Sequence, residues 1–85
     1  MQRLGLILQI SPSRNMIAKV ENIPRIGETV VDENLKPVGK VFDILGPVSS
    51  PYVAIRPTMH GLERLVNKPV YVIPSRRRKE KNKYG

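Results

Sequence analysis

The segment GKVFDILGPVSSPY, residues 39–52, constrains the fold of this chain more than any other part of it. Successive side chains of a strand point to opposite faces, so a strand here shows apolar residues on both sides. The two faces are expected to carry Val41 with Leu45, and Phe42 with Ile44. One face can fill the core of a small domain. The simplest cover for the other face is a partner protein.

Length and composition narrow the class of protein. A chain of 85 residues forms one domain with a modest core. The absence of cysteine excludes a disulfide framework and a thiolate metal site. No apolar run approaches the roughly 20 residues that cross a bilayer, and residues 1–10 lack the sustained apolar core of a signal peptide. We therefore expect an intracellular soluble protein that has no membrane partner.

Short alternating apolar runs, separated by Pro and Gly, predict a series of strands. The expected strands cover residues 4–10, 16–21, 29–32, 38–45, 52–56 and 70–73. Six strands without a long helix favour a small, closed antiparallel barrel. Its interior is expected to take Leu4, Leu6, Leu8, Val41, Val53 and Ile55. Residues 60–67 fit one helical turn, and Asn67 before a Lys-Pro pair is a candidate for a left-handed conformation.

Residues that could carry catalysis do not form a recognisable site. His60 is the only histidine, and Ser49 and Ser50 have no nearby base in the sequence. Asp32 and Glu33 flank a turn, where acidic residues are common. The sequence therefore predicts a protein that is not an enzyme, with no metal, no cofactor and no small-molecule substrate.

The Gly46-Pro47 pair has two compatible interpretations. It forms a turn, because glycine supplies a permissive backbone and proline fixes the next φ. It also braces a rigid apolar patch that loses little entropy when a partner binds. The patch would consist of Pro47, Val48, Pro51 and Tyr52. Asp43 is expected at a rim of the barrel, or accepting backbone N–H bonds from the Gly46 turn, because a buried carboxylate would cost several kcal/mol.

The positive charge is concentrated at the C-terminus. The chain has 15 Lys and Arg against 7 Asp and Glu, a net charge of +8, and residues 76–83 alone carry +5. We expect a core domain over residues 1–74 and a disordered tail over residues 75–85. The tail either binds RNA phosphates or only keeps the protein soluble. The candidate phosphate contacts are Arg76, Arg77, Arg78, Lys79, Lys81 and Lys83.

The stretch GKVFDILGPVSSPYVAI resembles the core signature of the glycine-arginine-rich-domain proteins of H/ACA ribonucleoproteins. The likeness continues through RLGLIL, ETVVDENLKPVGKV and KPVYV, and covers roughly residues 3–73. The Gly/Arg-rich repeats that flank eukaryotic members are missing. The chain is therefore most similar to the short archaeal form of this family, which implies a cytoplasmic location; a eukaryotic member would be nucleolar.

This resemblance implies a fold and a partner. Members resemble the second domain of translation elongation factors, a six-stranded Greek-key barrel. They are non-catalytic subunits that dock on the catalytic domain of the guide-RNA-dependent pseudouridine synthase, and they influence substrate RNA loading and product release in rRNA modification. Guide RNA and rRNA are reached through the complex. By motif, the docking residues would be Ile44, Leu45, Gly46, Pro47, Val48, Pro51 and Tyr52.

Two other functions stay open. One is a direct RNA-binding barrel, in which aromatic side chains stack on bases. Phe42, Tyr52 and Tyr71 are the only aromatics before the tail, and their spacing forms no tight motif. The other is a translation accessory domain that contacts the ribosome, which the elongation-factor-like barrel would allow.

Overall fold

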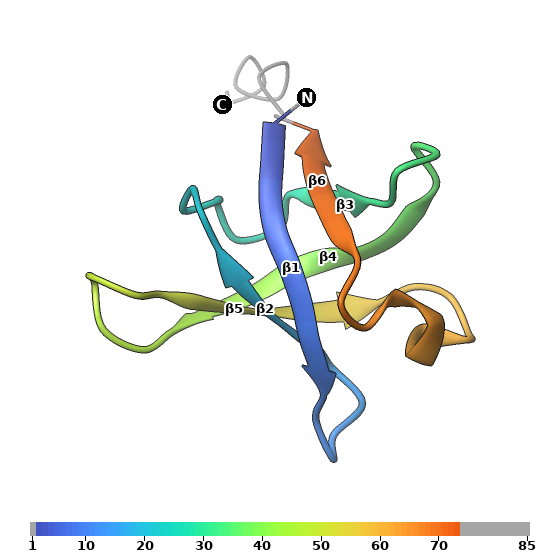
Figure 1. Ribbon diagram of the computed structural model, residues 1–85, viewed down its shortest axis with the longest axis horizontal. Coiled ribbons are helices and arrows are strands. Elements are labelled where there is room, and N and C mark those ends of the chain that lie inside the picture. The colour runs from blue at the N-terminus through green and yellow to red at the C-terminus, as the bar shows by residue number, and fades with distance from the viewer. Residues whose placement is uncertain (1, 74–85) are drawn as a thin grey trace, which may run out of the picture.

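The computed structural model describes residues 2–73, which form six strands and one short 3₁₀ helix (Figure 1). The elements are β1 (Gln2–Ile10), β2 (Met16–Val20), β3 (Thr29–Val31), β4 (Pro37–Leu45), β5 (Tyr52–Pro57), η1 (Leu62–Leu65) and β6 (Pro69–Ile73). Each predicted strand is present, with bounds within two residues of those expected. Within residues 2–73, no helix has the length and apolar character needed to cross a membrane. The predicted tail and its boundary at residue 74 lie outside the described residues.

The strands close into a barrel in which every neighbouring pair is antiparallel. Their order around the barrel is β1-β2-β5-β4-β3-β6. Strands β3, β4 and β5 follow one another, and β6 then returns to lie beside β3, which is Greek-key topology. The predicted all-β Greek-key barrel is confirmed. In Figure 1, β1 crosses in front of β4 and β5, and the hairpin that joins β4 to β5 extends to the left.

The core is built from the inward-facing side chains of all six strands, and η1 supplies two more. It contains Leu4, Ile7, Met16, Ala18, Val20, Val30, Val38, Val41, Val53, Ile55, Leu62, Leu65, Val70 and Val72. Burial of each large apolar side chain contributes about 1.5–3 kcal/mol to folding. No polar or charged side chain among the described residues is buried. Every polar and charged side chain of residues 2–73 is therefore at least partly exposed at the surface of the barrel.

The connection from η1 to β6 lies against β1. The predicted helical turn is present as η1, and Asn67 has a φ of 70°, as expected for a left-handed residue. Asn67 N–H donates to Ile7 O at 2.7 Å, and Ile7 N–H donates to Lys68 O at 3.2 Å. These bonds hold Leu62 and Leu65 in the core cluster.

In β1, the predicted interior was wrong for Leu6 and Leu8, whose side chains are exposed, whereas Ile7 is fully buried. The pairing of β1 with β6 shifts register between Arg3 and Gly5, so Leu4 is an extra residue on β1. A bulge of this kind displaces the following side chains to the opposite face. Simple alternation therefore fails after Leu4, which is itself buried as predicted.

A second bulge resets β4 in the same way. Val41 pairs with Ile55 and Asp43 pairs with Ala54, so Phe42 is the extra residue. Val41 faces the core and Ile44 packs against it, while Phe42 and Leu45 are exposed. The expected grouping of Val41 with Leu45, and of Phe42 with Ile44, was therefore wrong. The bulge reverses the direction of the side chains that follow it, so Ile44 points toward the core and Leu45 toward solvent.

Beyond this bulge, β4 has a strand on one side only within the described part of the chain. Pairing with β3 ends at Lys40, and the backbone of Val41 bonds to residues 27 and 28 of a loop. Farther on, Ile44 N–H donates to Asp43 Oδ1 at 2.8 Å. Asp43 is exposed, as expected for a charged residue at a rim, but its bonding partner is Ile44 and not the Gly46 turn.

Candidate functional site

The β4–β5 hairpin presents the residues that the sequence singled out. Leu45 and Tyr52 form its last cross-strand pair, and residues 46–51 make the turn. Gly46 has a φ of 83°, in the left-handed region that favours glycine. Ser50 N–H donates to Pro47 O at 3.1 Å and closes the turn. The Gly-Pro turn expected from the sequence is therefore present.

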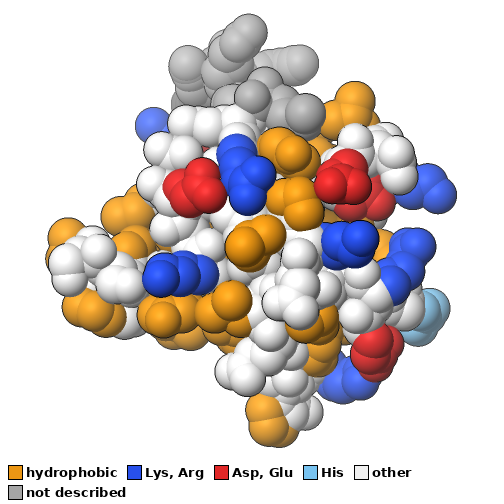
Figure 2. Space-filling model, in the orientation of Figure 1, with side chains coloured by type: hydrophobic (Ala, Val, Ile, Leu, Met, Phe, Trp, Pro, Cys, Tyr) orange, Lys and Arg blue, Asp and Glu red, His pale blue; other side chains and the backbone are white. Residues whose placement is uncertain are grey.

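The end of this hairpin is an exposed apolar surface, which we call the tip surface. It consists of the exposed Leu45, Pro47 and Val48 together with the half-buried Pro51 and Tyr52. Val48 is 89% exposed, the highest value among the large apolar side chains of residues 2–73, and Leu45 is 39% exposed. Figure 2 shows apolar side chains gathered at the left end of the molecule, over this hairpin. Ile44, which the motif also included, instead packs against the core.

The tip surface is braced by contacts within the protein. A Cβ added to Gly46 would lie 3.3 Å from the Tyr52 ring, so the turn passes close to that ring. Val20 N–H donates to Pro51 O at 3.4 Å, which extends the pairing of β2 alongside β5. Proline at positions 47 and 51 fixes two further φ angles. A partner that binds here meets a surface with little conformational entropy left to lose.

A second feature lies on the same outer face, closer to the barrel. The Arg56 guanidinium carbon stands 4.3 Å from the centroid of the Phe42 ring, within the range of a cation–π contact. Lys40 is directly opposite Arg56 across the β4–β5 pairing. The sequence singled out Phe42 but not the two cationic residues near it. Their positions depend on the bulge at Phe42 and on the register between β4 and β5, which a single sequence does not show.

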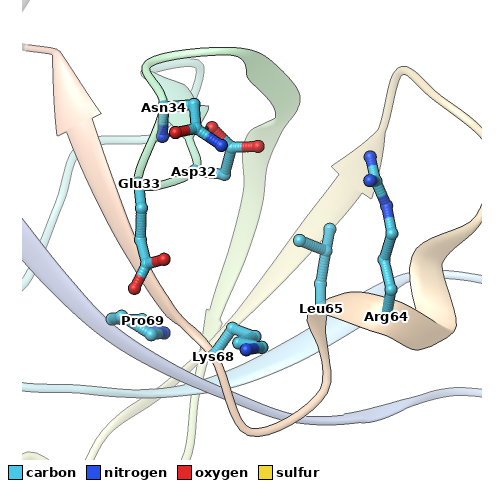
Figure 3. A pocket seen from close by; sticks show the side chains of 7 residues that line it. All are labelled: Asp32, Glu33, Asn34, Arg64, Leu65, Lys68 and Pro69. Atoms are coloured by element: carbon cyan, nitrogen blue, oxygen red, sulfur yellow. Dashed lines mark hydrogen bonds between the residues drawn. The ribbon is translucent and has the colours of Figure 1, made fainter.

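A hollow of about 250 Å³ lies between the β3–β4 turn and the η1–β6 connection (Figure 3). It is lined by Asp32, Glu33, Asn34, Arg64, Leu65, Lys68 and Pro69. Asp32 Oδ1 accepts backbone N–H bonds from Asn34 at 2.8 Å and from Lys36 at 3.0 Å. Asp32 therefore shapes the turn, as its position in the sequence indicates. In residues 2–73, no three His, Cys, Asp or Glu side chains are grouped to hold a metal ion.

The remaining predicted residues do not join these surfaces. His60 is exposed in the loop before η1. The six candidate phosphate contacts between Arg76 and Lys83 lie outside the described residues. The sites that the structure brings together are thus the tip surface and the Phe42–Arg56 pair.

The sequence model of the family described as "Gar1/Naf1 RNA binding region" matches residues 1–82. An uncharacterized protein of Methanothermobacter thermautotrophicus is 33% identical over 76 residues, which are 85% of this chain and 83% of that protein. Another, from Methanocaldococcus jannaschii, is 40% identical over 57 residues, 67% of this chain and 69% of its own length.

The family match covers nearly the whole chain and agrees with the barrel and with the GKV and LGPV motifs that it contains. The family consists of non-catalytic RNA-binding proteins with roles in H/ACA ribonucleoproteins and rRNA modification. This chain belongs to the Gar1/Naf1 RNA-binding-region family.

Proposed function

We propose that this protein is a non-catalytic subunit of the H/ACA guide-RNA pseudouridylation complex. It docks through the tip surface on the catalytic domain of the pseudouridine synthase, and it modulates substrate RNA loading and product release during rRNA modification. Guide RNA and rRNA are its partners through the complex. The complex would act in the cytoplasm of an archaeal cell.

The observation that carries this proposal is the exposure of Val48 at the end of a braced hairpin. An apolar side chain that is 89% exposed gains almost no stabilisation from burial in the isolated barrel. Fixed apolar surface of this kind is typical of protein interaction sites. Family membership directs the choice of partner to the H/ACA particle.

The direct test is a pull-down of the full chain with an H/ACA pseudouridine synthase after nuclease treatment. We expect stoichiometric recovery of the synthase without RNA, because the tip surface is apolar and needs no nucleic acid to bind. Recovery that depends on intact RNA would instead favour an RNA-binding role for the barrel.

Removal of residues 76–85 tests the division of labour between barrel and tail. We expect the truncated protein to keep its fold and its synthase binding. RNA affinity should fall and become less dependent on salt, because a protein that contacts fewer phosphates releases fewer counterions when it binds. RNA binding and synthase binding are measured over a salt titration. Loss of the synthase at moderate salt would show that the tail itself docks.

A further inference from the structure

The outer face of the β4–β5 hairpin carries two positive charges that stand opposite each other. Lys40 and Arg56 are direct cross-strand neighbours, and both side chains are exposed. Like charges directly opposite each other across two strands destabilise a sheet. The one ion pair found in residues 2–73 joins Arg3 to Glu21, at 3.2 Å, so no carboxylate of this part of the chain pairs with either cation. A group with negative charge that binds at both cations would relieve their repulsion.

The Arg56 guanidinium is already ordered for such a group. Its central carbon lies 4.3 Å from the centroid of the Phe42 ring, which the bulge in β4 turns outward. A guanidinium presents its N–H donors as a planar fork that matches the two oxygens of a carboxylate. Because contact with the ring restricts the arginine side chain, less conformational entropy is lost when the fork binds. We call Lys40, Phe42 and Arg56 the charge anchor.

We propose that the charge anchor binds a carboxylate on the surface of the protein that receives the tip surface. This inference rests on the proposed docking function and adds the chemistry of the partner, which is an apolar socket for Val48 and, beside it, an Asp or Glu side chain that accepts from Arg56 and Lys40. Arg56 lies four residues along β5 from Tyr52, about 13 Å at about 3.3 Å per residue, and this distance sets the spacing of the two features. A misaligned partner would bury two cations without a counter-charge, so the anchor fixes the alignment of the complex.

One partner can cover the tip surface and the charge anchor together. Side chains alternate along a strand, so the outward position on β5 between Tyr52 and Arg56 is Ala54. In agreement, Val53 and Ile55 belong to the core cluster and Ala54 does not. The Ala54 side chain is a single methyl group. A partner that lies along β5 therefore meets no large β5 side chain between the two surfaces.

Asp43 favours a protein over a nucleic acid as the source of the negative charge. Asp43 is exposed and pairs with Ala54 across the two strands, so it stands between the tip surface and the charge anchor. A nucleic-acid strand carries a negative charge on every nucleotide, and one that followed the hairpin would be repelled by the Asp43 carboxylate. A protein surface can place one carboxylate at Arg56 and leave the position beside Asp43 without negative charge.

The test is calorimetric titration of a nuclease-treated H/ACA pseudouridine synthase with the full chain, at several salt concentrations. We expect Arg56→Gln to weaken binding about thirtyfold or more, because the carboxylate of the partner is left unpaired in the interface. Arg56→Lys keeps the charge without the fork and should lose about threefold to tenfold. The affinity of the natural protein should fall more steeply with salt than that of Arg56→Gln, because the variant lacks one charge pair.

Lys36→Gln is the matched control for the loss of one positive charge. Lys36 is exposed in the β3–β4 turn and belongs to neither surface. Its variant should bind the synthase within about twofold of the natural protein. Because Arg56 is also exposed, thermal melts of the Arg56 variants should show the same cooperative unfolding as the natural protein.

The outcomes separate this inference from the docking function. Natural synthase affinity in a folded Arg56→Gln variant would overturn the charge anchor. If Val48→Asp lost the synthase in the same series, the docking function would stand without the anchor. If both variants kept natural affinity, both proposals would fail. Each variant is also titrated with a short single-stranded oligoribonucleotide, and loss of RNA binding with synthase binding intact in Arg56→Gln would overturn the anchor and assign its cations to phosphates.

Discussion

Replacement of Val48 by aspartate is expected to abolish synthase binding without unfolding the protein. Val48 is 89% exposed, so the new carboxylate is solvated in the free chain and stability changes by no more than about 0.5 kcal/mol. In the complex it would lie unpaired in an apolar interface, at a cost of several kcal/mol. That cost corresponds to roughly a hundredfold or greater loss of affinity. Calorimetric titration with the synthase, together with a thermal melt, measures both effects.

A neighbouring variant separates burial from charge. Ser49 is exposed, polar and adjacent in the turn, so Ser49→Asp adds the same charge without replacing an apolar contact. We expect it to bind at least ten times more tightly than Val48→Asp. Equal losses in the two variants would point to long-range repulsion. Natural affinity in a folded Val48→Asp variant would place the interface elsewhere.

Val48→Asp should slow repeated turnover of the assembled particle more than it slows the chemical step of pseudouridine formation. Because the family is non-catalytic, loss of this subunit removes no reacting group. We expect slower multiple-turnover modification and little change in a single turnover. Ile44→Asp would be a poor substitute for this test, since Ile44 packs against the core and its charge would destabilise the barrel.

The second large effect is expected from Gly5→Ala. A Cβ at this position would overlap the carbonyl oxygen of Lys19 on the paired strand β2. The oxygen belongs to backbone within the sheet and the Cβ is fixed by the backbone of β1, so neither can move aside cheaply, and overpacking of this kind costs about 3 kcal/mol. For a domain of this size, the melting temperature should fall by roughly 12–24 °C. Thermal unfolding followed by circular dichroism measures it.

Gly27 provides the matched control for this prediction. It has a φ of 93°, and a Cβ added there meets nothing within 4 Å. Gly27→Ala should therefore cost only the backbone strain, about 1–2 kcal/mol. If the two variants lost equal stability, the contact with Lys19 would not be the reason that Gly5 is required.

The sequence was sufficient for elements that depend on local chemistry. Alternating apolar residues, together with the prolines and glycines between them, predicted where the strands lie. Asn67 adopts the left-handed conformation that its position in a turn predicts. Side-chain direction was predicted correctly only where alternation is unbroken. The errors at Leu6 and Ile44 each follow a bulge, and a bulge is defined by the partner strand. One sequence does not reveal that pairing.

The candidate sites divide in the same way. The tip surface follows from a local signal, because glycine and proline fix a turn wherever the strands lie. The contact between Phe42 and Arg56 joins residues fourteen positions apart in the sequence. It depends on the bulge at Phe42 and on the register that places Lys40 opposite Arg56. Without that register, Phe42 is only an isolated aromatic residue.

The Asp43 side chain has a consequence for how the protein behaves at high concentration. A strand that lacks a neighbour can template the pairing of another molecule, and such edges lead to aggregation. On β4, the Ile44 N–H that an incoming chain would need is already bonded to Asp43 Oδ1. A second copy approaching this edge would meet an Ile44 N–H that is already hydrogen-bonded and the negative charge of the Asp43 carboxylate. The hairpin can thus keep an apolar end available for a partner while its edge discourages self-assembly into fibrils.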